Sequence, residues 1–454
     1  MTKRPQNPAI PRDTSAVSSL DLSKRDLTLD LARVFCVLLV VVIHLLFIGV
    51  GRDEAGELVI SRPLEEQPWF AAATWIGQIM PLFFVVGGFA SITAWRSNVR
   101  RGGTAADYVK TRVLRLAQPS LPLFLFYVVV IGGATLLAIA PELVRTVVVG
   151  AGAPLWFIAA YTLVQALVPV MVRLHTRAPK ATLAVLLAGV IVVDAARFAS
   201  GIPQIGYLNM VFVWLLVQQI GFWYADGWFA RRTWWQLVLI MVACYAAIAP
   251  LVAAGIHSPD MLTNLNPPTL PLVLLGLAQA CALRLLRPAL AKLMSTHAAR
   301  AVVFVVGSRL MTIYLWHLPV IIILAGVALL IPGASPEPAT AGWWWSRILV
   351  YLLVLGVLFA LSLVVGRYEQ PIEAGSTPPI AIVALAAALT FIAPFLVIEY
   401  FLDLWLAILG AVTFSLAILL LGRWPLRWGG TVSPVHERAA KPAPATGAKE
   451  PATA

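Results

Sequence analysis

The chain has 454 residues, of which 60% are hydrophobic and only 12% are charged, and its mean hydropathy is +0.87. Soluble domains carry about 25% charged residues, so this composition excludes a soluble globular protein and indicates an integral membrane protein. The formal net charge of +12 would also suit a nucleic-acid partner, but the placement of the basic residues explains it differently.

Twelve apolar segments of roughly membrane length predict an all-α polytopic bundle, because they lack the alternation of a β-barrel. The first is too long and uninterrupted for a signal peptide, so we expect it to stay as a membrane anchor. The ninth is long enough to contain a break or a strong tilt, and the last pair is less certain because Glu399 and Asp403 lie in its connecting turn. The segments span approximately 29–50, 69–94, 116–139, 153–172, 181–199, 207–226, 235–254, 268–286, 302–330, 347–366, 379–401 and 404–422.

With a cytoplasmic N-terminus, alternating sides put 28 of the 33 Lys and Arg residues in cytoplasmic segments. This bias is the positive-inside pattern, so it supports an even number of spans with both termini in the cytoplasm and needs no nucleic acid. Residues 1–25 and 429–454 are polar and low in complexity, and we expect disordered cytoplasmic tails there. The five basic residues left outside are Arg52, Arg62, Arg145, Arg197 and Arg347.

The first apolar segment carries two polar residues that its hydropathy does not explain. Arg33 lies at its start and His44 follows eleven residues later, which puts them about 16 Å apart on nearly the same helix face. Since the hydrocarbon core is about 30 Å thick, we expect Arg33 at one boundary and His44 near the middle. An imidazole at that depth indicates chemistry, although a histidine satisfied by a neighbouring helix is an equal alternative. Asp30, three residues before Arg33, could pair with it.

Four further residues are candidates for binding a substrate or supporting the site. Arg112 and Arg115 are three apart on the cytoplasmic side and would share a helix face, where guanidinium pairs can bind phosphate. His317 lies at a depth comparable to that of His44 and could share a cavity with it. Trp156 is expected near the outer interface, where a belt aromatic is more common than a ligand. The odd, scattered cysteines Cys36, Cys244 and Cys281 argue against a disulfide frame or a metal site, and we expect no metal.

These residues occur in blocks that resemble, in order, the acyltransferase 3 family of bacterial multi-pass membrane O-acyltransferases. The first block is Asp30-Leu-Ala-Arg33 with His44, and the last runs from Ser308 through Tyr314-Leu-Trp-His317-Leu-Pro319. The resemblance covers about residues 28–368, and one departure is Gly87, where the family usually has Ser. The blocks between them are Pro81-Leu-Phe-Phe-Val-Val-Gly-Gly-Phe89, Tyr108-Val-Lys-Thr-Arg112-Val-Leu-Arg115-Leu-Ala-Gln-Pro119 and Leu155-Trp156-Phe157-Ile158.

The resemblance implies transfer of an acyl group, often acetyl, from a cytoplasmic acyl-CoA co-substrate to a hydroxyl, with no bound cofactor. His44 would then act as base or nucleophile with Arg33 beside it, and Arg112 and Arg115 would bind donor phosphates. It also implies an acyltransferase core over residues 26–370, to which residues 371–428 add a C-terminal transmembrane hairpin. The expected location is the cell membrane.

The residues leave the acceptor and the protein class open. A cell-envelope glycan or glycolipid is the first expectation for the acceptor, and a secondary metabolite such as a macrolide is the second. Twelve spans also suit a transporter, although the short linker 227–234 and the lack of similarity between the halves disfavour it. The third alternative is an inactive acyltransferase-like scaffold, which the retained Arg33, His44, Arg112 and Arg115 disfavour.

Overall fold

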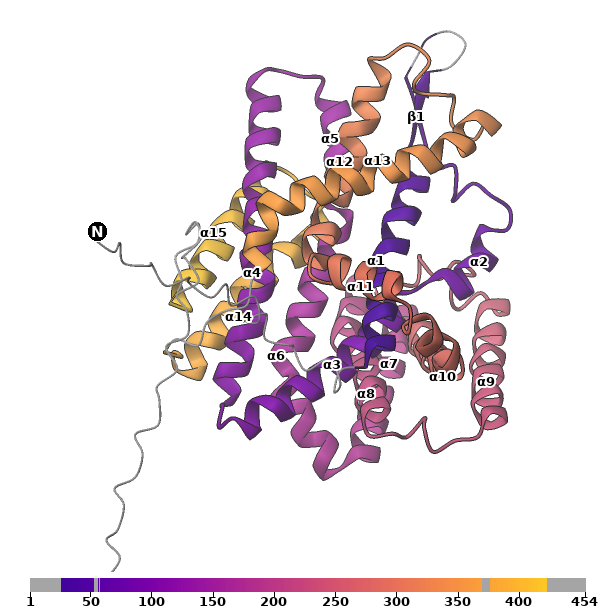
Figure 1. The fold of residues 1–454 in the computed structure, drawn as a ribbon, viewed down its shortest axis with the longest axis vertical. Helices are drawn as coiled ribbons and strands as arrows, with labels where there is room; N and C mark the ends of the chain where they lie inside the picture. The colour runs from indigo at the N-terminus through magenta and orange to yellow at the C-terminus, as the bar shows by residue number, and fades with distance from the viewer. Residues whose placement is uncertain (1–25, 53–55, 57, 370–375, 423–454) are drawn as a thin grey trace, which may run out of the picture.

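The computed structural model describes residues 26–52, 56, 58–369 and 376–422, and this part of the chain is almost entirely helical (Figure 1). The predicted tails 1–25 and 429–454 lie outside the described residues. The elements are α1 (Leu27–Phe47), β1 (Gly49–Arg52), β2 (Leu58–Ser61), α2 (Phe70–Gly77), α3 (Met80–Arg100), α4 (Ala105–Leu136), α5 (Pro141–Gly152), η2 (Ala153–Leu155), α6 (Trp156–Arg177), α7 (Pro179–Ser200), η3 (Pro203–Leu208), α8 (Asn209–Ala225), α9 (Trp234–Ala253), α10 (Leu270–Leu293), α11 (His297–Gly307), α12 (Leu310–Leu329), α13 (Ala341–Val365), η4 (Gly366–Glu369), α14 (Ile380–Tyr400) and α15 (Leu404–Leu420).

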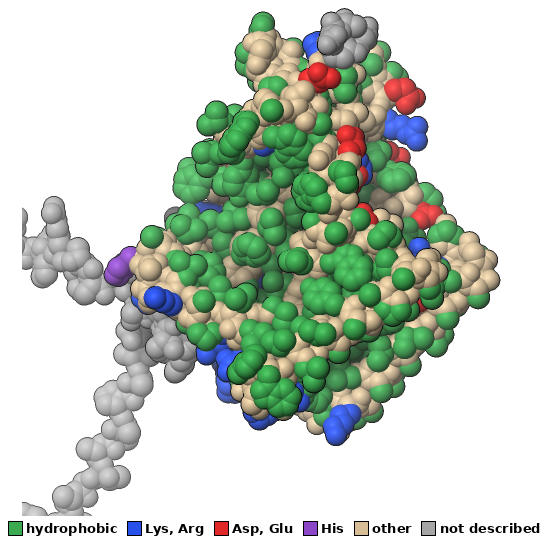
Figure 2. Space-filling model, turned by 90° about the vertical axis from the view of Figure 1, so that its right-hand side faces the viewer, with side chains coloured by type: hydrophobic (Ala, Val, Ile, Leu, Met, Phe, Trp, Pro, Cys, Tyr) green, Lys and Arg blue, Asp and Glu red, His purple; other side chains and the backbone are tan. Residues whose placement is uncertain are grey.

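Eleven helical segments of the described chain are long and apolar enough to cross a membrane, and α15 is a shorter apolar helix of 17 residues. Together they correspond to the twelve predicted segments, so the protein is a multi-pass membrane protein. Figure 2 shows hydrophobic side chains over the middle of one face, with acidic side chains in its upper half and several basic ones along its lower edge. This distribution is the one that a bilayer requires, because charged groups are costly in its core.

Three of the spans are broken, and two of the breaks position the site described below. The second span divides between α2 and α3 at Gln78–Ile79, and the fourth divides between α5 and α6 at η2. The ninth divides into α11 and α12, which confirms the predicted break. Non-helical backbone inside a membrane protein is tolerated where it is buried in protein or lines a cavity. Both of the first two breaks line the same pocket.

The first outer loop contains a small β-hairpin that the sequence analysis did not predict. Strands β1 and β2 pair antiparallel, with Gly49 opposite Ser61. The Ser335 hydroxyl, in the outer loop between α12 and α13, donates a hydrogen bond to the Val50 carbonyl oxygen at 2.8 Å. Each strand has four residues, and the alternation of polar and apolar side chains over so short a stretch cannot be recognised in an apolar sequence. For this reason the hairpin was not predicted.

Close backbone contact joins α3 to α8 at the centre of the bundle. A Cβ atom on Gly88 would collide with the carbonyl oxygen of Gln218, and one on Gly221 would collide with that of Val85. Small residues allow this approach, so Gly88 serves helix packing.

The C-terminal hairpin is part of the same bundle: α14 packs against α4 and α6, and α15 packs against α4. Gly410 of α15 lies directly against the Phe124 ring of α4. Glu399 accepts hydrogen bonds from Gln204 and Tyr207, so it ties α14 to η3. Asp403 caps α15 by accepting a hydrogen bond from the Leu406 amide. The two acidic residues that made this pair uncertain therefore anchor it.

Candidate active site

His44 lies nearer the outer end of α1 than the sequence analysis expected. The helix ends at Phe47 and the chain then enters β1, so His44 belongs to the last turn. Arg33 lies six residues inside the helix rather than at its start. Hydropathy alone extended the helix to Val50, a residue that pairs in the β-hairpin, so it placed His44 too far from the end of its helix. The depth of His44 in the membrane stays a prediction.

His44 is in ring contact with His317 of α12, which confirms the prediction that the two imidazoles lie at a comparable depth. Their ring centroids are 4.9 Å apart, and the rings meet edge to face. The Nδ1 atom of His44 lies 2.9 Å from the Val40 carbonyl oxygen, and Nδ1 of His317 lies 2.6 Å from that of Tyr314. A carbonyl only accepts, so each Nδ1 carries the hydrogen and each neutral ring keeps its lone pair on Nε2. Nε2 of His317 is buried and has no partner among the described residues.

A pocket of about 250 Å³ opens beside His44. Its walls come from the outer half of α1, from α2 and the α2–α3 break, and from the residues around η2, together with Leu262 and Leu265 of the loop after α9. Trp156 lines it and is only 7% exposed, with its ring stacked on Trp214 at 5.6 Å. The expectation that Trp156 is a belt aromatic at the interface is therefore wrong, because the α5–α6 break turns the start of α6 into the bundle.

Arg33, Arg112 and Arg115 come together on the predicted cytoplasmic side of this pocket. Arg33 and Arg112 both act electrostatically on Arg115, as does Glu369 of η4. α4 begins at Ala105 with a capping box between Thr104 and Asp107, so Arg112 and Arg115 share a helical face as predicted. The arginines outnumber the carboxylates Glu369 and Asp30, and this excess of positive charge suits an anion.

Two of these arginines carry a guanidinium nitrogen that remains unsatisfied. The Nε atoms of Arg33 and Arg112 are buried and have no hydrogen-bond partner among the described residues. The Arg112 guanidinium lies 5.0 Å from the centre of the Tyr108 ring, which orients it without neutralising it. Unsatisfied buried donors are costly, and an anionic group would satisfy these two. Asp30 lies half-buried one turn before Arg33.

A line of aromatic rings connects the histidine pair to the arginine cluster, and sequence reasoning missed it. It runs from His317 to Tyr314 at 5.8 Å, to Phe157 at 4.6 Å and to Tyr161 at 5.2 Å between ring centroids. Tyr161 in turn acts electrostatically on Arg115. Its ring faces Gly87, where a Cβ atom would lie 3.3 Å from Cε2. Phe157 and Tyr161 are four residues apart, so the sequence predicts that their rings share a helix face. In an apolar chain that spacing is also typical of ordinary core packing, so it did not single them out.

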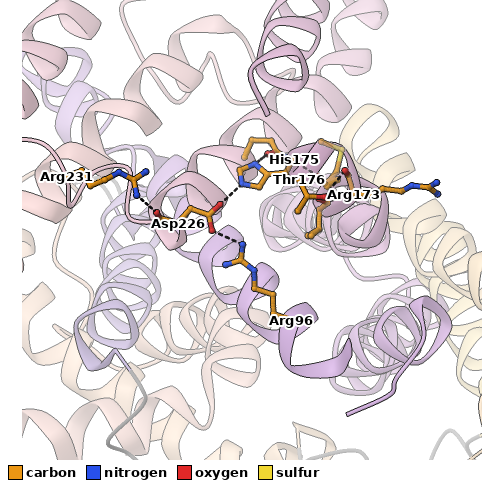
Figure 3. A network of polar contacts seen from close by, with 9 residues as sticks. Arg96, Arg173, His175, Thr176, Asp226 and Arg231 are labelled. Atoms are coloured by element: carbon orange, nitrogen blue, oxygen red, sulfur yellow. Dashed lines mark hydrogen bonds and ion pairs between the residues drawn. The ribbon is translucent and has the colours of Figure 1, made fainter. Parts of the chain in front are cut away.

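A separate polar network joins α3, α6 and α8 at the predicted cytoplasmic end of the bundle (Figure 3). His175 donates to a carboxylate oxygen of Asp226 at 2.9 Å, and Arg96 donates to the other at 2.7 Å. Gln219 bonds the second imidazole nitrogen at 2.8 Å. Burial alone would raise the pKa of Asp226, but the hydrogen bonds from His175 and Arg96 outweigh it and hold that pKa below its ordinary value. The network is structural, since it shares no residue with the pocket.

Replacing Asp226 with Asn should lower the melting temperature at pH 7 by several degrees. A carboxyl whose pKa is lowered on folding adds stability above its unfolded pKa of about 4, and this stability disappears as the pH falls through the folded value. The difference between D226N and wild type should therefore shrink as the pH falls from 7 to 3, as measured by thermal unfolding in detergent. Glu142→Gln, at an exposed site on α5, is the control. A pH-independent difference would show that the charge is not responsible.

Comparison with known families identifies the chain. Residues 26–367, which form most of it, match the family described as Acyltransferase domain, the acyltransferase 3 family. The chain therefore belongs to this family and is a multi-pass membrane acyltransferase. The match ends before α14 and α15. Neither a curated protein nor a solved structure matches the chain significantly.

Proposed function

We propose that this acyltransferase moves an acyl group, most simply acetyl, from cytoplasmic acyl-CoA to a hydroxyl acceptor that reaches His44 from the outer side. One observation carries the proposal: the same helix, α1, presents Arg33 to a cytoplasmic cluster of arginines and His44 to a pocket near its outer end. Donor and acceptor can then approach from opposite faces and meet inside the protein. The acceptor classes expected from the sequence, an envelope glycan or glycolipid and a macrolide-type metabolite, remain proposals.

In the proposed reaction His44 acts as general base through Nε2, the nitrogen that its hydrogen bond to Val40 leaves with a lone pair. Nε2 takes the acceptor's hydroxyl proton while the oxygen attacks the thioester carbonyl. The carbon–sulfur bond then breaks, the ester is released, and the imidazolium returns its proton to the CoA thiolate. The adjacent His317, whose Nε2 also keeps its lone pair, would stabilise the charged ring. An acyl-imidazole intermediate on His44 is the alternative.

The donor would lie between the two ends of α1. Arg33, Arg112 and Arg115 suit the CoA phosphates, because guanidinium groups bind phosphate through charge-assisted pairs. Arg33 and His44 are eleven residues apart, so the pantetheine arm must cover roughly 16 Å. The aromatic line through Tyr314, Phe157 and Tyr161 connects these ends and would form one wall for the arm.

Measurement of CoA release tests the proposal. Purified protein in lipid nanodiscs is given acetyl-CoA with and without hydroxyl acceptors, and free thiol and ester products are quantified. We expect acceptor-dependent release of CoA together with an equal amount of ester. Movement of an acceptor across proteoliposomes without any use of acetyl-CoA would instead favour the transporter. Binding of acetyl-CoA with no release under any condition would favour an inactive scaffold.

Tyr161→Phe should lower kcat/KM for acyl-CoA by about two- to tenfold, the range for losing one hydrogen bond. The Tyr161 hydroxyl makes no hydrogen bond within the described chain, so its removal leaves folding intact and affects only a bound molecule. Tyr400→Phe, at an exposed position at the end of α14, is the control. An unchanged kcat/KM for Y161F would remove Tyr161 from the donor path.

A further inference from the structure

The pocket beside His44 contains few groups that could hold a sugar. Within the described chain, no Asp, Glu, Lys or Arg lines it, and its walls are mainly aliphatic and aromatic. Sugar sites depend on side chains that hydrogen-bond ring hydroxyls, because a buried hydroxyl without a partner is costly. The remaining polar side chains in the walls therefore decide what the pocket can accept.

Three of these polar side chains are already engaged within the protein. The Thr74 hydroxyl donates to the Ala71 carbonyl oxygen and accepts from the Met261 amide. Gln78 accepts from the Met80 amide and donates to the Met261 carbonyl oxygen. These bonds stabilise the α2–α3 break, so they are not free to turn toward a ligand.

The third engaged group is the Tyr314 hydroxyl, which donates to the Pro154 carbonyl oxygen at 2.8 Å and so holds η2 against α12. What remains is Nε2 of His44 and the indole N–H groups of Trp69 and Trp156, for which the described residues provide no hydrogen bond. One acceptor atom suits the one hydroxyl that reacts. Two indole N–H donors, one from Trp69 at the start of α2 and one from Trp156 at the start of α6, cannot satisfy the several further hydroxyls of a sugar ring.

We infer that the acceptor is an apolar alcohol, a molecule whose reacting hydroxyl stands on a hydrocarbon framework, and not the hydroxyl of a sugar ring. This inference rests on the proposed function and narrows its acceptor. The framework fills the apolar walls, and its hydroxyl meets His44. A pocket of about 250 Å³ is smaller than the ~300–1,000 Å³ typical of whole-ligand sites, so it holds only the part of the acceptor around the hydroxyl.

The first test compares four probe acceptors on the wild-type protein in nanodiscs with acetyl-CoA. Menthol and 1-octanol carry their hydroxyl on an apolar framework, whereas methyl glucoside and octyl glucoside carry theirs on a sugar. Ester formation is measured by mass spectrometry. We expect kcat/KM for the better apolar alcohol to exceed that for either glucoside by at least tenfold. Equal or faster acylation of a glucoside overturns the inference, and so does acylation of none of the four while acetyl-CoA is still hydrolysed.

The second test changes the pocket through two neighbouring residues of α2. Ala73 lines the pocket and Ala72 does not, and both are exposed. Ala73→Phe should raise KM for menthol tenfold or more and leave KM for acetyl-CoA unchanged, while Ala72→Phe should change neither. An unchanged KM for menthol in A73F places the acceptor elsewhere and overturns the inference. Failure of all variants and wild type to use acetyl-CoA would instead contradict the proposed function.

Discussion

His44→Ala should reduce acyl transfer by at least tenfold, and by about 10²–10⁴-fold if the imidazole is the general base. His44 lines the pocket, contacts His317 and presents Nε2 with a lone pair. Within the described chain, the His44 ring makes one hydrogen bond, to the carbonyl oxygen of Val40 in its own helix. Its loss in H44A should therefore not prevent folding or insertion. CoA release and ester formation, measured at saturating acetyl-CoA, give the size of the loss.

The matched control for H44A is His297→Ala, because His297 is an exposed histidine at the start of α11, outside the pocket. The elution volume and melting temperature of both variants should equal those of the wild type. H44A activity above about a tenth of wild type would exclude His44 as the base, since general-base assistance contributes at least 10²-fold. If H44A no longer binds acyl-CoA in a direct binding measurement, the ring has a structural role instead.

The fold class could be predicted from the sequence because a helix that crosses a membrane needs about 20 consecutive apolar residues. Apolar length reports a span directly, so the apolar helices could be read from hydropathy. Helix breaks were harder to predict. The breaks at Gln78 and Pro154 fall within apolar runs, and they depend on hydrogen bonds to residues far away in the chain, Met261 and Tyr314.

The site was partly predictable for the same reason. Arg33 and His44 are easily recognised in an apolar helix. The free-energy cost of placing an ionisable side chain in a membrane makes a functional role the expected explanation. Tyr161 and Tyr314 do not stand out, because aromatic residues are common in any membrane bundle and only the packing of α6 against α12 puts them in line. The burial of Trp156 was missed because the rule for interface aromatics assumes an unbroken helix.

The free energy of donor binding should depend most on charge at the cytoplasmic end of the site. Replacing both Arg112 and Arg115 with Gln should raise the apparent KM for acyl-CoA at least a hundredfold, because a charge-assisted hydrogen bond contributes about 1.5–3 kcal/mol. The KM for the acceptor should change far less. Arg33 and Arg112 each keep a buried Nε without a partner in the described chain, and such a donor suits a phosphate oxygen. Initial rates at varied acetyl-CoA and fixed menthol give the two constants.

The control pair is Arg173 and Arg177, near the cytoplasmic end of α6. Both are exposed, and the side chain of Arg173 points away from the network around Asp226 (Figure 3). The double change to Gln at these positions removes the same formal charge, so a general loss of cytoplasmic positive charge would affect both pairs equally. Of the two pairs, Arg112 and Arg115 are the ones close to Arg33, because Arg33 acts electrostatically on Arg115. Equal effects from the two pairs, or an effect confined to the acceptor's KM, would move the donor site away from α4.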